Sequence, residues 1–279
     1  MDPQLLSLGI ALLLGGCLAG FSAGLFGIGG GAILVPVLYY TFAALGYSED
    51  VIMHMAVATS ASVIVVTSIR SAHGHNKHGA VDWSLVWPKN PLRSWGIWIG
   101  VGALLAAALV ARALSGTQLT MLFGIVIGVL ALQFIFGRPD WRLANDVPRG
   151  IAPPVAGTTL GGLCALMGIG FGSIGVTLMI LCGRKIHQAI GTAAAIGFFI
   201  GLPATFGYIY AGLGVDGRPP LSVGYVNMLG FAIMAVATLL MVPLGVRTAH
   251  GLSQKRMRMV FGIFLLIIAA NMMRKAMTG

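Results

Sequence analysis

Residues 24–33 read GLFGIGGGAI and residues 165–174 read ALMGIGFGSI, two glycine-rich stretches that align position by position. Each is followed by a second shared motif, which reads HMAVAT at 54–59 and HQAIGT at 187–192. Two matched motifs in the same order at similar separations are hard to obtain by chance. They indicate that the chain is an internal duplication of about 140 residues.

The composition places this duplicated chain in a membrane. Of its 279 residues, 57% are hydrophobic and only 9% are charged, and the mean hydropathy is +0.93. A water-soluble domain carries about a quarter charged residues, so lipid must be the main solvent here. The net charge of +10 would suggest nucleic acid in a soluble protein. Because the basic residues fall in short connections between apolar runs, we instead read them as orientation signals of a bacterial inner-membrane protein with no nucleic-acid partner.

Apolar segments alternate with these connections along the whole chain. Full transmembrane helices need about 20 residues, so the second segment is short and the seventh is too short. Both follow a glycine cluster, and helices broken inside a membrane are tolerated only where protein or a water-filled cavity receives the free backbone groups. We predict an all-α polytopic membrane protein with broken or short helices at the glycine motifs. Its ten segments cover residues 4–23, 30–46, 52–72, 94–111, 118–137, 151–168, 172–183, 188–212, 223–246 and 259–273.

The distribution of positive charge predicts how the two halves are oriented. Five segments per half is an odd number, so a first repeat over residues 1–140 and a second over residues 141–279 should be inverted relative to each other. With ten crossings, 13 of the 17 Lys and Arg residues lie on one face. By the positive-inside rule that face is cytoplasmic and both termini are periplasmic. Charge does not decide whether segments 30–46 and 172–183 span fully or form re-entrant hairpins.

The glycine clusters are candidate anion-binding elements. Glycine allows positive φ, and a helix that begins just after a glycine turn points free N–H groups and a positive dipole end toward it. Broken helices in inverted-repeat transporters bind anionic groups in this way. The alternative is close helix packing, because small residues are common where membrane helices touch. Recurrence beside a shortened segment favours a substrate-binding role for Gly27, Gly29, Gly30, Gly31, Gly170, Gly172 and Ser173.

Hydroxyl side chains in the third segment form a second group of candidates. Thr59, Val63, Thr67 and Arg70 are spaced as one helical stripe. One interpretation is that the stripe lines an anion path, with Arg70 at the cytoplasmic end. The alternative is that the hydroxyls bond to neighbouring helices while Arg70 reaches the membrane interface. Thr59 has a counterpart in the second half, and we predict substrate contacts from Thr59, Ser60 and Thr192.

Two histidines at equivalent positions are candidates for coupling or gating, together with Arg70. His54 and His187 begin the segments after the short ones, where they either titrate with transported protons or anchor helix ends at an interface. All seven Asp and Glu residues lie in termini or connections. Since a cation transporter usually needs membrane-embedded carboxylates, we predict that simple cations are not carried.

The sequence lacks the motifs of ATP hydrolysis and of common hydrolases. It has no P-loop, no catalytic serine elbow and no zinc-protease helix. The histidines of loop 73–78 match no tight metal motif, and the three cysteines lie in separate apolar runs. An intramembrane enzyme built on the histidine loop is a rival interpretation that would require a bound metal. We predict no enzyme activity, no metal and no cofactor.

The duplicated motif resembles the TauE/SafE family of sulfite and organosulfonate exporters. GIGGG at 27–31 with LVP at 34–36 and HMAVAT at 54–59 carries the resemblance, and the second-half copy extends it over essentially the whole chain. The resemblance implies a secondary transporter that exports small sulfur-containing anions such as sulfite, sulfoacetate or other organosulfonates. Phe171 replaces a motif glycine and Thr177 stands where the first half has Pro36, so the two halves are expected to contribute unequally.

An anion channel is the rival function, because it would share every feature above except alternating access. Saturable flux with counterflow would favour the transporter, and rapid linear flux would favour the channel. The sequence leaves open the exact substrate, the direction of transport, the coupling ion and the oligomeric state.

Overall fold

The computed structural model describes residues 3–27, 29–137, 144–148, 150–249 and 254–278. Seven helices in these ranges are long and apolar enough to cross a membrane, which confirms the prediction of an all-α polytopic membrane protein. They are α1 (Pro3–Phe26), α3 (Glu49–Asn76), α5 (Trp95–Leu105) extended by the π-helical turn η2 (Ala106–Val110) and α6 (Ala111–Ala113), α7 (Gly116–Phe136), α10 (Ile186–Ala211), α11 (Met228–Ala249) and α12 (Gln254–Thr278).

Shorter elements complete the bundle and its ends. Two of them, α2 and α9, are the short apolar helices predicted after the glycine clusters, and α8 continues a π-helical turn, η3. The short elements are α2 (Gly31–Ala44), η3 (Pro153–Gly157), α8 (Thr158–Met167), α9 (Gly172–Leu181), α4 (Trp83–Val86), the 3-10 turn η1 (Pro91–Arg93), β1 (Ser222–Val223) and β2 (Val226–Asn227).

The glycine motifs form the turns of two helical hairpins, α1–α2 and α8–α9. Gly27, Gly29 and Gly30 all have positive φ, as does Gly168, which ends α8. At 1.5 Å per residue, α2 is about 21 Å long and α9 about 15 Å, whereas the hydrocarbon core is about 30 Å thick. Neither short helix therefore crosses a membrane by itself, and each returns to the end from which its hairpin partner came.

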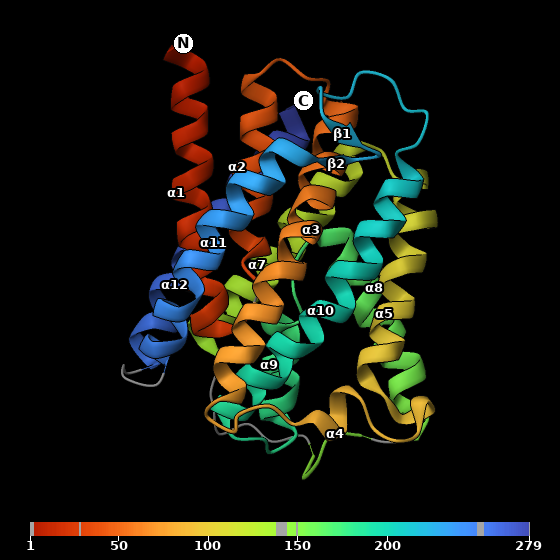
Figure 1. The fold of residues 1–279 in the computed structure, drawn as a ribbon, viewed down its shortest axis with the longest axis vertical. Coiled ribbons are helices and arrows are strands. Elements are labelled where there is room, and N and C mark those ends of the chain that lie inside the picture. Colours follow the sequence, from red (N-terminus) through yellow and green to blue (C-terminus); the bar gives the residue numbers. More distant parts are fainter. Residues whose placement is uncertain (1–2, 28, 138–143, 149, 250–253, 279) are drawn as a thin grey trace.

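The chain alternates in direction from helix to helix. Figure 1 shows the N- and C-terminal ends at the same end of the bundle as the β1–β2 hairpin, with α4 at the opposite end.

The segment predicted to be helical from residue 223 instead begins with this hairpin. Gly224 turns the chain with φ 57°, and the Asn227 side chain accepts a hydrogen bond from Gly230 N–H, so α11 starts at Met228.

The helices pack in pairs, and replacing each helix by its counterpart in the other half gives the same set of pairs. The N-terminal helix α1 packs along α11, and α8 packs along α5 in the same manner; α3 packs on α10, and α7 on α12. Glycines permit these close contacts: a side chain at Gly20 would lie 2.5 Å from Thr238 O, and one at Gly102 would overlap Thr158 O. Helix α3 is the centre of the bundle, and residues 51–64 are buried without interruption.

Candidate functional site

The two glycine turns meet in the interior of the bundle. A side chain at Gly29 would lie 3.2 Å from Gly170 Cα, and one at Gly31 would overlap the carbonyl oxygen of Gly168. The glycines named as candidates are buried. Segments from opposite halves, far apart in sequence, thus come into backbone contact. The first turn of α2 and the first turn of α9 both begin beside this contact.

Close packing also explains part of the glycine motif. A side chain at Gly27 would lie 2.6 Å from Ile190 O, and one at Gly30 would lie 2.8 Å from Ala19 O. These two glycines have positive φ as well, so larger residues would be strained there on two counts. A packing role for Gly27 and Gly30 is therefore visible in the structure, whether or not a ligand binds nearby.

Hydroxyl groups of α3 hold the glycine turns in place. Ser60 donates a 2.8 Å hydrogen bond to the carbonyl oxygen of Gly168 in the other half. Thr67 lies 3.4 Å from the carbonyl oxygen of Gly29 and 3.1 Å from that of Val63. Because the carbonyls of Gly168 and Gly29 belong to non-helical turns, Ser60 and Thr67 satisfy backbone acceptors that the helices leave free.

Thr59 and Thr192 make the same contact in the two halves. The Thr59 hydroxyl accepts a 3.0 Å hydrogen bond from Asn227 N–H, just before α11. The Thr192 hydroxyl accepts a 2.9 Å bond from Asp82 N–H, just before α4. Both threonines are fully buried. A hydroxyl can donate while it accepts, so this structural role is compatible with the predicted ligand contact.

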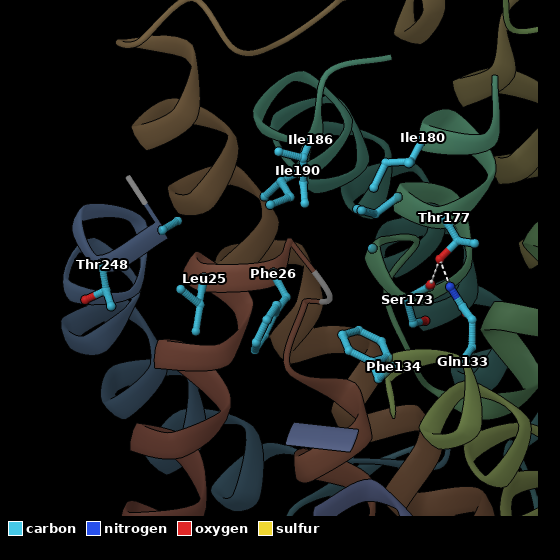
Figure 2. Close-up of a pocket in the computed structure, with 13 residues that line it drawn as sticks. Leu25, Phe26, Gln133, Phe134, Ser173, Thr177, Ile180, Ile186, Ile190 and Thr248 are labelled. Atoms are coloured by element: carbon cyan, nitrogen blue, oxygen red, sulfur yellow. Dashed lines mark hydrogen bonds between the residues drawn. The ribbon is translucent and has the colours of Figure 1, made fainter. Parts of the chain in front are cut away.

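A small cavity lies at the start of α9. One wall is polar and consists of Ser173, Thr177 and Gln133, which Figure 2 shows together. Ser173 is only 2% exposed, and its Oγ atom makes no hydrogen bond to any residue that the structure describes. Gln133 Nε2 donates to the Thr177 hydroxyl, which lies 3.3 Å from the carbonyl oxygen of Ser173. The remaining lining residues are Leu25, Phe26, Phe134, Gly172, Val176, Ile180, Ile186, Ile190, Thr248 and Ala249.

The equivalent place at α2 has no matching polar wall. Ala32 aligns with Ser173, and Pro36 aligns with Thr177. The hollow beside this part of α2 is lined by Ile33, Phe261 and Phe264 among other apolar groups, with Ser22 as its hydroxyl residue. The start of α9 is thus polar, whereas the start of α2 is apolar.

The two equivalent histidines have different environments. His54 is buried at the β-hairpin end, where its ring nitrogens lie 3.1 Å from Asp50 O and 2.9 Å from Ala111 O. Its ring stacks on Tyr225 at a centroid distance of 5.0 Å, and burial raises the pKa of the Tyr225 phenol. His187 is instead exposed at the α4 end. Sequence equivalence therefore does not give these histidines a shared role.

Arg70 does not complete the predicted stripe on the inside of the protein. Thr59, Val63 and Thr67 are fully buried, whereas Arg70 is exposed next to the exposed Ile69. The spacing of the stripe does not cause this, because 11 residues at 3.6 per turn bring Arg70 back almost to the direction of Thr59. The exposure of Arg70 instead depends on what packs against this part of α3, and Arg70 lines no cavity at the glycine turns.

Ion pairs tie down both ends of the bundle. At the α4 end, Arg184 lies 3.2 Å from Asp82 and 2.8 Å from Asp146. At the other end, Glu49 lies 3.0 Å from Lys275 and accepts a 2.6 Å hydrogen bond from Tyr39. Arg184 and Glu49 occupy the equivalent connections α9–α10 and α2–α3. An ion pair thus fixes the chain where it leaves each helical hairpin.

Gln133 is the lining residue that the sequence interpretation missed. It is an uncharged polar residue within an otherwise apolar span, a kind of residue that membrane helices often use to bond across to a neighbour. This signal was present in the sequence, but its partner Thr177 is 44 positions away. Among the described residues, no group of three His, Cys, Asp or Glu side chains could hold a metal ion.

Comparison with known proteins assigns the chain to a family. The family described as "Sulfite exporter TauE/SafE" matches residues 12–272. The chain belongs to the TauE/SafE family. This membership confirms the resemblance carried by the duplicated motif. It makes the chain a membrane transporter of a family that is not enzymatic.

Curated relatives agree with this TauE/SafE assignment. A "Probable membrane transporter protein" of Haemophilus influenzae is 29% identical over 94% of this chain and 97% of the relative. One of Methanocaldococcus jannaschii is 26% identical over 92% and 94%, and one of Xylella fastidiosa is 30% identical over 69% and 71%. No solved structure gives a significant match to the chain.

Proposed function

We propose that this TauE/SafE protein is a secondary transporter that exports a small sulfur-containing anion, such as sulfite, sulfoacetate or another organosulfonate, by alternating access. The observation that carries the proposal is the contact between the two glycine turns, where α2 and α9 both begin. The N–H groups in the first turn of a helix have no intrahelical partner, and the helix dipole is positive at that end. Two such ends near one point favour an anion.

The surroundings of this contact suit a weakly held anion. Candidate ligand contacts are the backbone around Gly29, Gly31, Gly170 and Gly172 and the hydroxyls of Ser173, Thr59, Ser60 and Thr192. Among the residues that the structure describes, no carboxylate lines the cavity at α9, so a negative charge meets no repulsion from these lining residues. The same described lining contains no Lys or Arg, which favours release after binding. Sulfite and sulfonates offer three acceptor oxygens to such donors.

Alternating access is supported by the arrangement of the halves. The pairings of α1 with α11, α5 with α8, α3 with α10 and α7 with α12 are kept when the first five apolar segments are exchanged with the last five. Inverted repeats of this kind allow one arrangement of the halves to open toward each face in turn. We place both termini in the periplasm and the α4 end in the cytoplasm of the bacterial inner membrane, because the α4 end carries most of the basic connections.

Reconstituted protein provides the test. Proteoliposomes loaded with unlabelled sulfite should accelerate uptake of labelled sulfite, and the rate should saturate with concentration. Flux that rises linearly without counterflow would assign the protein to the channel class. Uptake of sodium or potassium without any response to sulfite or sulfonates would contradict the proposed substrate class.

A further inference from the structure

We infer that the anion binds on one side of the core, in the cavity at the start of α9, with the Ser173 hydroxyl as a direct ligand. The inference rests on the proposed function and deepens it, because it names the hairpin and the side chain that contact the anion. Thr177 and Gln133 act as positioning residues for this site. No side chain at the start of α2 contacts the anion, and α2 contributes only the dipole of its N-terminus and close packing.

The environment of Ser173 is the first argument. Its hydroxyl is buried, lines the cavity, and has no hydrogen-bond partner among the described residues. Buried hydroxyls without partners are rare, since desolvation without a compensating hydrogen bond costs free energy. Many helical serines and threonines avoid this cost because their hydroxyl donates to the carbonyl oxygen one turn back, as the Thr205 hydroxyl does to Gly201 O. A ligand oxygen in the cavity would satisfy the Ser173 hydroxyl.

The backbone of α9 adds further donors at the same point. Ser173 is the second residue of this helix, and no side chain caps its N-terminus. The N–H groups of the first turn therefore lack intrahelical partners, and the dipole adds attraction for a negative group. Hydroxyl and backbone groups in one cavity wall form a set of donors for an oxyanion with several acceptor oxygens.

A chain of hydrogen bonds fixes this helix start against α7. The amide of Gln133 donates to the Thr177 hydroxyl, and Thr177 lies one turn after Ser173 with its hydroxyl 3.3 Å from the Ser173 carbonyl oxygen. The donors of α9 are thereby held in register with the wall formed by α7. Removing the Thr177 hydroxyl should loosen the site without removing a ligand.

The cavity walls formed by aromatic and aliphatic side chains determine which substituent the anion can carry. Phe26 and Phe134 lie edge to face, with ring centroids 5.7 Å apart, and Ile180, Ile186 and Ile190 line the other side (Figure 2). The cavity is thus polar at Ser173, Thr177 and Gln133 and, apart from Thr248, apolar elsewhere. An oxyanion with a short apolar substituent, such as ethanesulfonate, can place its charged group at α9 and its alkyl group against these walls.

Comparison of three serine and alanine positions makes the inference testable. Ser173→Ala removes the proposed ligand group. Ser62→Ala is the matched control, because Ser62 is also a buried helical serine, but its hydroxyl already donates to Thr59 O at 2.6 Å. Ala32→Ser adds a hydroxyl at the α2 position that corresponds to Ser173. All three are made in the full chain and purified in detergent.

Binding is measured by calorimetry with sulfite and with ethanesulfonate, and thermal unfolding is followed without ligand. We expect Ser173→Ala to unfold at the same or a higher temperature than the parent, because an unpartnered hydroxyl is removed. Its affinity for the anion should fall about tenfold or more, as for a lost hydrogen bond to a charged group. Ser62→Ala and Ala32→Ser should bind as the parent does. Thr177→Val should weaken binding, and Thr177→Ser should restore it.

The outcomes separate this inference from the proposed function. If the parent carries and binds an anion while Ser173→Ala binds it with parental affinity, the one-sided site is wrong and the transport function stands. A change of affinity in Ala32→Ser, in either direction, as large as that in Ser173→Ala would also overturn it, because a side chain at the start of α2 would then reach the ligand. If the parent neither binds nor carries either anion, the proposed function itself fails.

Discussion

The Thr59 hydroxyl accepts a hydrogen bond of 3.0 Å from the backbone N–H of Asn227, 168 positions later in the chain. The second half repeats the relationship, with Thr192 accepting from Asp82 N–H at 2.9 Å. Each threonine of the duplicated motif thus fixes a connection of the other half: Thr59 fixes the one that follows α10, and Thr192 the one that follows α3. The motif thus has a structural function in addition to any contact with substrate.

Replacing either threonine by valine should destabilise the protein. Valine keeps the shape but leaves a buried backbone N–H without an acceptor, which costs about 1–3 kcal/mol. We expect Thr59→Val and Thr192→Val to lower the unfolding temperature in detergent, whereas Thr59→Ser and Thr192→Ser should unfold near the parental temperature. Thermal unfolding monitored by size exclusion measures this, and valine variants as stable as the parent would exclude the anchoring role.

The contact between the glycine turns should tolerate no side chain at Gly31. A Cβ there would overlap Gly168 O and lie 2.7 Å from Ile169 Cα, both backbone atoms that cannot rotate away. Overpacking of this kind costs about 1–3 kcal/mol or more, so Gly31→Ala should yield little folded protein. Gly9→Ala is the control, since Gly9 is also helical but has no atom within 4 Å of the added Cβ. Equal recovery of the two variants would contradict the tight contact.

The two ends of the bundle should face opposite sides of the membrane. Ser48 and Asn76 are exposed residues before and at the end of α3. In a background with the three native cysteines replaced by alanine, we expect an impermeant thiol reagent added to intact cells to label Ser48→Cys and to leave Asn76→Cys unlabelled. Labelling of both in permeabilised cells shows that each thiol is reactive. The reverse pattern in intact cells would place the termini in the cytoplasm.

The ion pairs of Arg184 should differ in strength. The Asp82 side chain is 13% exposed, whereas that of Asp146 is 50% exposed. An exposed pair contributes at most about 1 kcal/mol, so Asp146→Asn should change thermal stability little. Asp82→Asn should cost more, about 1.5–3 kcal/mol, because a less exposed charged hydrogen bond is lost. Unfolding temperatures at low and high salt test this order, and salt should reduce the Asp146 effect first.

Local features of the sequence were sufficient to predict most of the fold. The ten apolar segments correspond to the helices within a few residues, because hydropathy depends only on neighbouring residues and on the thickness of lipid. The short segments after the glycine clusters appear as α2 and α9. The glycines themselves predict the turns between the hairpin helices, since they adopt the positive φ that other residues avoid. The duplication and the charge asymmetry remain the basis of the proposed inverted topology.

Only the tertiary structure decided which side chains meet. Gln133 and Thr177 pair because the last turn of α7 meets α9, and nothing local to either residue specifies the other. His54 and His187 occupy equivalent sequence positions, yet one is buried against Tyr225 and the other is exposed, because the connections packed around them differ. The sequence spacing of Arg70 places it on the same stripe of α3 as the buried Thr59 and Thr67, yet in the structure Arg70 is exposed. Burial and hydrogen bonding are properties of the assembled bundle. The sequence therefore indicates which residues are candidates for the site, and packing decides which of these residues lie close together.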